Sequence, residues 1–274
     1  MQFANYFIDL SVPRIMGIVN VTPDSFSDGG QFNQLDAALF QVERMLADGA
    51  TFIDVGGEST RPGAAEVAEQ QEIERVIPVI DAIVQRFDCV VSVDTSKARV
   101  MHEAVAHGAG LINDVRALQE PGALTTAAQS GVPVCLMHMQ GQPRTMQDAP
   151  DYVDVVADVA AFLTARAAEC VAAGISKNHI LLDPGFGFGK NLQHNYRLLA
   201  HLDKLACLDF PLLIGLSRKS MIGNVLEKPV EQRLIGSVTG ALLAAQRGAK
   251  ILRVHDVGPT MDALKIMQAM SEQE

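Results

Sequence analysis

The sequence predicts an α/β fold, a (β/α)8 (TIM) barrel that occupies residues 1–274 as a single domain. Short runs of β-branched and aliphatic residues alternate with longer segments of helical period, which is typical of βα units on a parallel sheet. Eight such units divide the 274 residues into about 34 each, the size of a barrel unit. Polar residues also end nearly every strand. A barrel gathers these ends at one face, whereas a doubly wound open sheet, the competing architecture, concentrates its site at one switch point.

The predicted strands are the short apolar runs. In order, they are Ile15–Asn20, Thr51–Val55, Val90–Asp94, Leu111–Asp114, Pro133–Met137, Ile180–Asp183, Leu212–Gly215 and Ile251–His255. Amphipathic stretches between them predict helices, the clearest at Leu35–Asp48, Glu72–Arg86, Lys97–His107, Tyr152–Ala172 and Gln232–Arg247. Just before several strands stands a glycine that is expected to end a helix in the left-handed conformation. These glycines are Gly49, Gly108, Gly131, Gly174 and Gly248.

Composition narrows the classes of function. The formal net charge is −10, so the surface as a whole repels nucleic acid and anionic lipid, and an anionic ligand needs a local basic cluster. No apolar run approaches the roughly 18 residues of a membrane span, and the first 15 residues lack a basic start followed by a long apolar core, so neither export nor membrane anchoring is expected. Four widely spaced cysteines without a C-x-x-C pair are typical of reduced thiols and not of a zinc site. We therefore expect a cytoplasmic protein with no nucleic-acid or membrane partner.

Period-two alternation sorts the residues near the carboxyl ends of the strands. Arg253 and His255 share a face and are expected in the barrel mouth, with Val254 against the helices. The same alternation separates His138 from Met137. With Met137 directed to a ligand, His138 is expected to pack outward as a structural histidine.

Four polar residues at or near strand ends suit a flat, neutral heterocycle with adjacent N–H groups and a carbonyl. The carboxylates of Asp94 and Asp183 accept hydrogen bonds, the carboxamide of Asn113 donates and accepts, and Lys219 donates to a carbonyl oxygen. Each residue taken alone is about as well explained by a strand-end cap or a salt bridge to a helix. The four together favour a ligand site.

A second group consists mainly of hydrogen-bond donors and positive charges. In a protein of net charge −10, the residues Asn20, Arg61, Arg253 and His255 predict a phosphate or diphosphate site. Asn20 also offers an oxygen ligand for Mg²⁺, an ion that usually keeps several waters and few protein ligands.

Three loops are distinctive. Those at 21–30 and 56–63 are rich in Gly, Pro, Ser and Asp and are expected to be active-site lids, not plain surface turns. The segment Gly185–Lys190 has the spacing of neither a P-loop nor a dinucleotide motif. Its glycines are expected to bring Phe188 close to a ligand over Asp183.

Taken together, these loops and strand ends resemble the bacterial dihydropteroate synthase family. The motifs are Met16–Gly30 (MGIVNVTPDSFSDGG), Asp54–Gly63 (DVGGESTRPG), Ser92–Lys97, Ile112–Asp114, Asp183–Lys190 (DPGFGFGK), Ser217–Ser220 (SRKS) and Arg253–Asp256. They extend over essentially the whole chain, and no site position departs from the family pattern.

The resemblance implies a (β/α)8 barrel that joins 6-hydroxymethyl-7,8-dihydropterin diphosphate to 4-aminobenzoate, releasing diphosphate and 7,8-dihydropteroate in folate biosynthesis. It also implies a homodimer. The length leaves no room for the pterin kinase domain fused to some eukaryotic relatives, so the single-activity bacterial type is expected.

The resemblance further implies a role for each matching residue. The pterin ring is implied to lie among Asp94, Asn113, Met137, Asp183, Phe188, Gly215, Lys219 and Arg253. Diphosphate and Mg²⁺ are implied at Asn20, Arg61, Arg253 and His255, with Asn20 as the metal ligand. The 4-aminobenzoate site, which sulfonamide inhibitors would share, is implied at Phe26, Thr60, Arg61, Pro62, Phe188, Lys219 and Ser220. Catalysis is implied to depend on Lys219, Arg253, His255, Asp94 and Arg61.

Three other functions remain open from the sequence. A pterin-binding methyltransferase, which passes a folate methyl group to a corrinoid protein, needs the same carboxylates but not the Ser-Arg-Lys-Ser element or the cationic group. A non-catalytic folate-binding barrel would bind ligand without releasing diphosphate. A class I aldolase with Lys219 as a Schiff base is disfavoured because a lysine near Asp94 and Asp183 is expected to stay charged.

Overall fold

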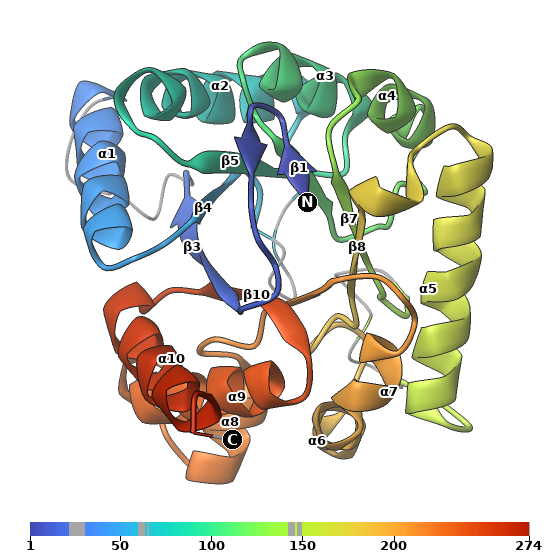
Figure 1. Cartoon of the computed structure of the whole chain (residues 1–274). Helices are drawn as coiled ribbons and strands as arrows, with labels where there is room; N and C mark the ends of the chain where they lie inside the picture. Colours follow the sequence, from blue (N-terminus) through green and yellow to red (C-terminus); the bar gives the residue numbers. More distant parts are fainter. Residues whose placement is uncertain (22–30, 60–63, 65, 142–145, 147–149, 274) are drawn as a thin grey trace.

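The strands close into a parallel barrel, which confirms the predicted fold class. The computed structural model describes residues 1–21, 31–59, 64, 66–141, 146 and 150–273, with the backbone alone for 31–34. Around the barrel the strands follow the order β10-β3-β4-β5-β6-β7-β8-β9, and every neighbouring pair is parallel. Figure 1 shows the helices as a ring outside the strands.

The barrel strands lie within two residues of their predicted positions. They are β3 (Arg14–Asn20), β4 (Phe52–Gly56), β5 (Val90–Asp94), β6 (Leu111–Asp114), β7 (Val134–Met137), β8 (Ile180–Asp183), β9 (Leu212–Ile214) and β10 (Ala249–Val254). The predicted strand included His255, but β10 ends at Val254, so His255 stands just beyond it. The five glycines expected to end helices all have positive φ, between +70° and +103°.

The helices connect successive strands. They are α1 (Gln31–Ala47), α2 (Glu69–Arg86), α3 (Ala98–Ala106), α4 (Ala123–Ser130), α5 (Val155–Ala172), α6 (Leu192–Ala200), α7 (Leu202–Ala206), α8 (Ser220–Leu226), α9 (Leu234–Gln246) and α10 (Val257–Ser271). Three predicted helix starts were too early, that at Lys97 by one residue, and those at Leu35 and Glu72 were too late by four and three residues. Helix α5 begins at Val155, because the Asp154 side chain caps it by accepting the Val156 N–H at 3.1 Å. Residues Val230–Gln232, where the start of α9 was predicted, form a 3-10 turn.

An N-terminal hairpin that the sequence reasoning missed fills one end of the barrel. Strands β1 (Gln2–Phe3) and β2 (Tyr6–Phe7) pair antiparallel and lie across the ring of strands in Figure 1. Phe3 is fully buried and meets the ring of Phe52 edge-on at 4.9 Å. It joins the apolar side chains that point into the barrel, among them Leu111 and Leu181. The hairpin therefore closes the end of the barrel opposite the carboxyl ends of the strands.

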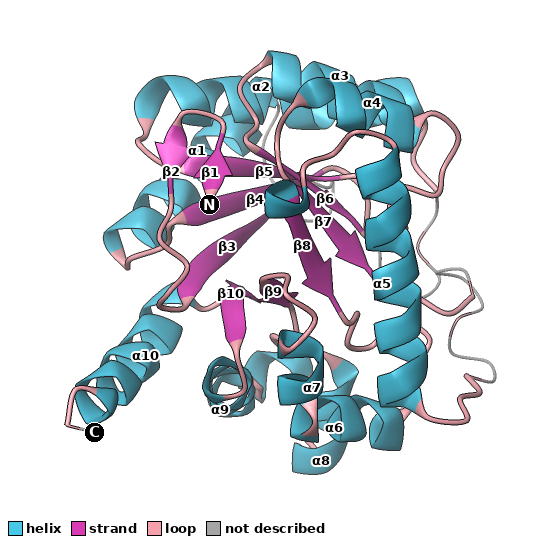
Figure 2. Ribbon diagram, turned by 45° about the vertical axis from the view of Figure 1, so that its right-hand side comes forward, coloured by secondary structure: helices cyan, strands magenta, loops and turns pink. Residues whose placement is uncertain are grey.

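The strand alternation separates this interior from the layer between strands and helices. Val93, Ile112 and Val254 belong to the outer layer. Asp94 follows Val93 and Arg253 precedes Val254, and both side chains lie at the carboxyl end of the barrel interior. Figure 2, turned by 45°, shows the same helices packed around the strand bundle. None of the described helices is both long and apolar enough to cross a membrane.

Candidate active site

The guanidinium of Arg253 lies between two carboxylates at the carboxyl end of the barrel. Its Nε donates to Asp54 Oδ2 at 2.6 Å, and its Nη2 donates to Asp94 Oδ2 at 2.7 Å. The three residues come from β10, β4 and β5. Burial tends to lower the pKa of Arg253, but the two carboxylates outweigh burial and raise it. Arg253 therefore remains a fixed positive charge at the floor of the site.

Asp54 is a site residue that the sequence reasoning missed. It is fully buried, and its Oδ2 also accepts a hydrogen bond from the Asn113 carboxamide at 3.3 Å. Its other oxygen, Oδ1, has no hydrogen-bond partner among the described residues. Asp54 stands third in its strand and not at the strand end, where polar site residues were expected. A charged residue inside an apolar strand was the available signal, because a buried charge requires a partner.

The surroundings of Asp94 place its pKa near neutral pH. Burial raises its pKa to about 7; Arg253 opposes this rise and Asp54 adds to it. A carboxyl group in this range can accept a ligand N–H when ionised and can change charge near neutral pH.

Asp183 and Lys219 form the other wall of the site. Asp183 Oδ1 accepts the N–H of Gly185 at 2.7 Å, and Lys219 Nζ donates to the carbonyl of Phe186 at 2.7 Å. The same amine lies 4.7 Å from the centroid of the Phe188 ring. Burial lowers the pKa of Lys219 to about 8, although Asp183 opposes the shift. A pKa of about 8 keeps the protonated form of Lys219 in excess at pH 7.

Apolar residues expected to line the ligand also come together. Met137 and Phe188 belong to one buried cluster, which includes Met146. Gly215 stands beside Arg253 and Lys219: a Cβ at this glycine would lie 3.7 Å from Arg253 carbons and 4.0 Å from Lys219 Nζ. A side chain at residue 215 would therefore occupy space beside both cationic groups.

The predicted anion-binding residues are only partly described. Asn20 is half-buried at the end of β3. It pairs in register with Gly56 of β4, and Gly56 pairs with Asp94 of β5, so the three residues stand at the same level of the barrel. His255 places Nδ1 3.1 Å from the Ser217 hydroxyl. Ser220 is the exposed first residue of α8. Four predicted residues lie outside the described part of the chain: Phe26, Thr60, Arg61 and Pro62.

The Ser-Arg-Lys-Ser turn that carries Lys219 is fixed by its neighbours. Arg218 has a left-handed φ of +59° and donates two hydrogen bonds to the Asp256 carboxylate, at 2.9 and 2.5 Å. Its N–H donates to the Ser237 hydroxyl at 2.9 Å. These contacts connect the β9 and β10 loops, so Lys219 and His255 are held by one network.

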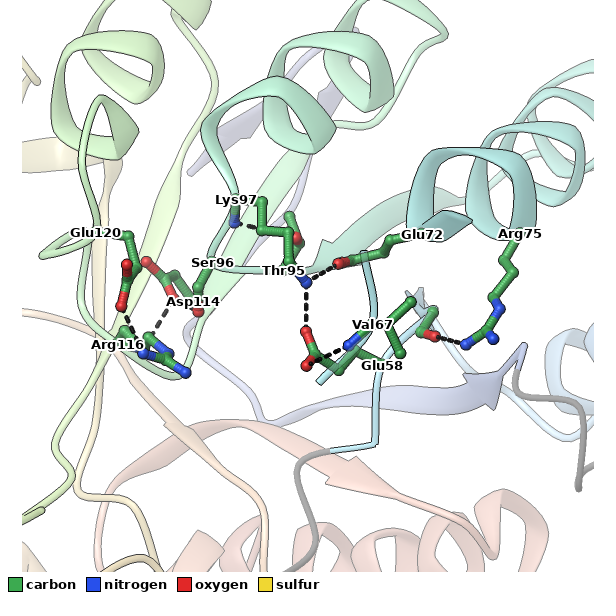
Figure 3. Close-up of polar contacts among 11 residues, drawn as sticks. Glu58, Val67, Glu72, Arg75, Thr95, Ser96, Lys97, Asp114, Arg116 and Glu120 are labelled. Carbon is green, nitrogen blue, oxygen red and sulfur yellow. Dashed lines mark hydrogen bonds and ion pairs between the residues drawn. The ribbon is translucent and has the colours of Figure 1, made fainter. Parts of the chain in front are cut away.

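A polar cluster beside Asp94 is shown in Figure 3 and was not predicted. Lys97 Nζ donates to Glu58 Oε2 and to Glu72 Oε2, each at 2.5 Å. The other oxygen of Glu58 accepts the N–H of Val67 at 3.2 Å, so Glu58 joins the two ends of the second βα loop. Glu58, Glu72 and Lys97 line a cavity of about 350 Å³, and Asp94 also lines it.

Comparison with known proteins decides the family. Residues 16–255 match the pterin binding enzyme family. The chain is 64% identical over 265 residues to the dihydropteroate synthase of Haemophilus influenzae, a match that covers 97% of this chain and 96% of that one. The chain belongs to the dihydropteroate synthase family.

Solved structures of the dihydropteroate synthase family have the same fold. The Yersinia pestis enzyme in a sulfonamide drug complex superposes with a TM-score of 0.95 at 59% identity, covering 99% of both chains. The Xanthomonas albilineans enzyme in complex with 7,8-dihydropteroate superposes with a TM-score of 0.90 at 50% identity, covering 98% of this chain and 97% of that one. The chain is therefore an enzyme, a transferase of this family.

Proposed function

We propose that this enzyme joins 6-hydroxymethyl-7,8-dihydropterin diphosphate to 4-aminobenzoate and releases diphosphate and 7,8-dihydropteroate. The observation that carries the proposal is the arrangement of Arg253 between Asp54 and Asp94, with Asp183 and Lys219 on the other wall. It combines carboxylate acceptors for ring N–H groups with cations for a departing anion in one mouth of the barrel.

The pterin ring is assigned to the buried polar wall. Asp183 and Asn113 would accept the ring and exocyclic N–H groups, as buried polar groups must find partners. Lys219 would exchange its bond to the Phe186 carbonyl for the ring carbonyl oxygen. Met137, Phe188 and Gly215 would line the ring, with Arg253 over its face.

The diphosphate is assigned to Asn20, Arg61, Arg253 and His255. When the C–O bond to diphosphate breaks, the pterin methylene becomes cationic and negative charge grows on the leaving group. Arg61, Arg253 and His255 would stabilise the departing charge, because donors aimed at developing charge lower the barrier. Asp54 and ionised Asp94 would favour the cationic ring. The arylamine already carries a free lone pair, so this step requires no strong general base.

We propose Mg²⁺ as the cofactor. The donor set fits it: Asn20 supplies a carboxamide oxygen at the end of β3, and Mg²⁺ usually keeps several waters and few protein ligands. The ion would be held by Asn20, diphosphate oxygens and waters, and would neutralise the diphosphate charge.

4-Aminobenzoate is assigned to Phe26, Thr60, Arg61, Pro62, Phe188, Lys219 and Ser220. Phe188 and Lys219 lie beside the pterin wall, where the arylamine must approach the methylene. Sulfonamides are proposed to share this site. The sulfonamide complex of the Yersinia pestis relative supports a sulfonamide site, and the dihydropteroate complex of the Xanthomonas albilineans relative supports a site for the joined product.

We also propose that the enzyme is a cytoplasmic homodimer. The four cysteines are unpaired, as expected of a reducing compartment. Adjacent helices α8, α9 and α10 expose large apolar side chains, a feature typical of association surfaces. These side chains are Val225, Leu226, Leu234, Ile235, Leu243, Ile266 and Met270.

One assay tests the proposed reaction. Diphosphate release from dihydropterin diphosphate is measured with and without 4-aminobenzoate, and the pterin product is identified by mass. Release coupled to 7,8-dihydropteroate formation is expected. Ligand binding without release would instead indicate a folate-binding barrel, and methyl transfer to a corrinoid would indicate the methyltransferase. Borohydride trapping of Lys219 would indicate an aldolase.

A further inference from the structure

Lys190 is a buried lysine beneath the glycine-rich loop that carries Phe186 and Phe188. Only 2% of its surface is exposed. Its Nζ lies 2.9 Å from His138 Nδ1, 3.3 Å from the His138 carbonyl, and 3.0 Å from each of the carbonyls of Gly185 and Phe188. None of these four contacts is to a carboxylate; the Asp183 carboxylate acts on this amine only through its charge.

We propose that Lys190 is a positioning residue of the pterin site. By binding the carbonyls of Gly185 and Phe188, it fixes the Phe188 ring and the Phe186 carbonyl that holds Lys219. This inference rests on the proposed function, because Phe188 and Lys219 are the groups assigned to the pterin.

Two lysines bind three carbonyl groups of this loop. Lys219 binds the Phe186 carbonyl, whereas Lys190 binds the carbonyls of Gly185 and Phe188. Lys219 also lies over the Phe188 ring at 4.7 Å. A shift of the loop would therefore move both the ring and the resting position of the Lys219 amine.

The loop packs directly on the segment that follows β7. A Cβ at Gly185, where φ is +69°, would lie 1.9 Å from the His138 carbonyl oxygen. A Cβ at Gly189, where φ is +60°, would lie 2.3 Å from the carbonyl oxygen of Gln140. Lys190 bridges these two segments, because it binds His138 on one side and the loop carbonyls on the other. His138 directly follows Met137, which lines the pterin site.

The His138 ring can accept a hydrogen bond from the Lys190 amine. Burial, and then the nearby Lys190 charge, lower the pKa of His138 to about 3, so its ring is neutral and Nδ1 can accept. Burial lowers the pKa of Lys190 to about 7, although the Asp183 charge opposes the shift. In its protonated form Lys190 has three N–H donors for the four acceptors. An apolar side chain of the same length would remove this donor from all four groups and leave the loop without its bridge.

The other contacts of the loop do not replace Lys190. The Tyr152 hydroxyl donates to the Gly189 carbonyl at 2.8 Å, and Asn195 donates to the Lys190 carbonyl at 3.1 Å. Asn195 Oδ1 accepts the N–H of Gly187 at 2.7 Å. These contacts hold the loop to Tyr152, which precedes α5, and to Asn195 in α6, whereas Lys190 ties Gly185 and Phe188 to the residue after β7.

The test compares Lys190→Met with Lys177→Met. Lys177 lies just before β8, and Lys190 lies after it. Because the Lys177 side chain is 56% exposed, Lys177→Met is a matched control for the loss of a lysine. Calorimetry with 6-hydroxymethylpterin gives the dissociation constant of the folded protein. We expect Lys190→Met to weaken pterin binding at least tenfold and to lower kcat, and Lys177→Met to match the wild type.

A merely structural role would lower the melting temperature and leave the dissociation constant of the folded protein unchanged, which would overturn the inference. If Lys190→Met does not fold, Lys190→Gln is measured instead. Its shorter amide can reach only part of the four acceptors, so weaker binding is expected, and wild-type affinity would again overturn the inference. Failure of the wild type itself to bind the pterin would contradict the proposed function and not the role of Lys190.

Discussion

Arg253 and Asp54 are 199 residues apart in the chain, and their side chains form an ion pair at 2.6 Å in the barrel mouth. The pair joins the last strand of the barrel to the second. Because Asp54 is fully buried, its charge depends on this guanidinium and on the Asn113 carboxamide. The same contact therefore supports the closure of the barrel and places a positive charge where a diphosphate is proposed to leave.

Removing the charge of Asp54 is expected to weaken both properties. Asp54→Asn should lower the free energy of unfolding by about 3 kcal/mol, the lower end for breaking a buried pair, because Arg253 keeps Asp94. It should also lower kcat/KM. Urea unfolding and steady-state kinetics provide the measurements, with the exposed Asp209→Asn as control. Unchanged stability and kinetics in Asp54→Asn would contradict this account.

The pH profile should reflect Asp94 and Lys219. Pterin affinity is expected to rise as pH passes through about 7, where Asp94 becomes ionised, and to fall above about 8, where Lys219 loses its proton. The sign is opposite for stability: a carboxyl whose pKa is raised on folding stabilises the folded state at low pH, and this contribution is lost as pH rises toward 7. Calorimetry of pterin binding across pH 5.5–9.5, in wild type and Asp94→Asn, tests the acid and the alkaline limb of the affinity profile. The acid limb should disappear in the variant; its persistence would assign it to another group.

Asp183 and Asn113 should matter for pterin binding more than for folding. Asp183→Ala or Asn113→Ala removes an acceptor from buried ring N–H groups, which costs on the order of 1 to 3 kcal/mol, or roughly ten- to a hundredfold in affinity. The measurement is calorimetry with a pterin ligand, and the exposed Asn224→Ala serves as control. Wild-type affinity in both folded variants would refute the assignment of the ring to this wall.

Turnover is expected to require Mg²⁺. Exhaustive chelation should abolish diphosphate release and leave the binding of a pterin without diphosphate intact, since only the phosphate oxygens need the ion. Asn20→Ala should raise the Mg²⁺ concentration for half-maximal rate about tenfold, the loss expected for one contact to a charged group. Full activity after chelation would count against the metal.

The cluster around Lys97 should contribute unequally to stability. Lys97→Met leaves Glu72, which is 1% exposed, without its cation, and should cost about 3 kcal/mol. Glu58→Gln should cost less than about 1 kcal/mol, because Glu58 is 27% exposed and its partner Lys97 keeps Glu72. Urea unfolding of the two variants ranks these costs. Equal losses would show that the burial of Glu72 is not the deciding factor.

Local patterns in the sequence determined much of this protein. The alternation of apolar runs and helical segments placed the barrel strands within two residues, because periodicity and helix-ending glycines such as Gly49 are properties of neighbouring residues. The same alternation placed Asp94, Asn113 and Asp183 at the mouth and turned His138 away toward Phe162, whose ring it meets edge-on at 4.9 Å.

Only the tertiary structure decided which of these groups meet. Asp54 finds Arg253 across the closure of the barrel, and Lys190 finds His138 across two successive strands; neither pairing has a period or a spacing that the sequence displays. The hairpin of β1 and β2 was likewise missed, because two-residue strands are too short to show alternation, and Phe3 gains its role only from the barrel it fills. The values near 7 and 8 for the pKa of Asp94 and Lys219 arise from burial against neighbouring charges, and burial exists only once the chain has closed around them.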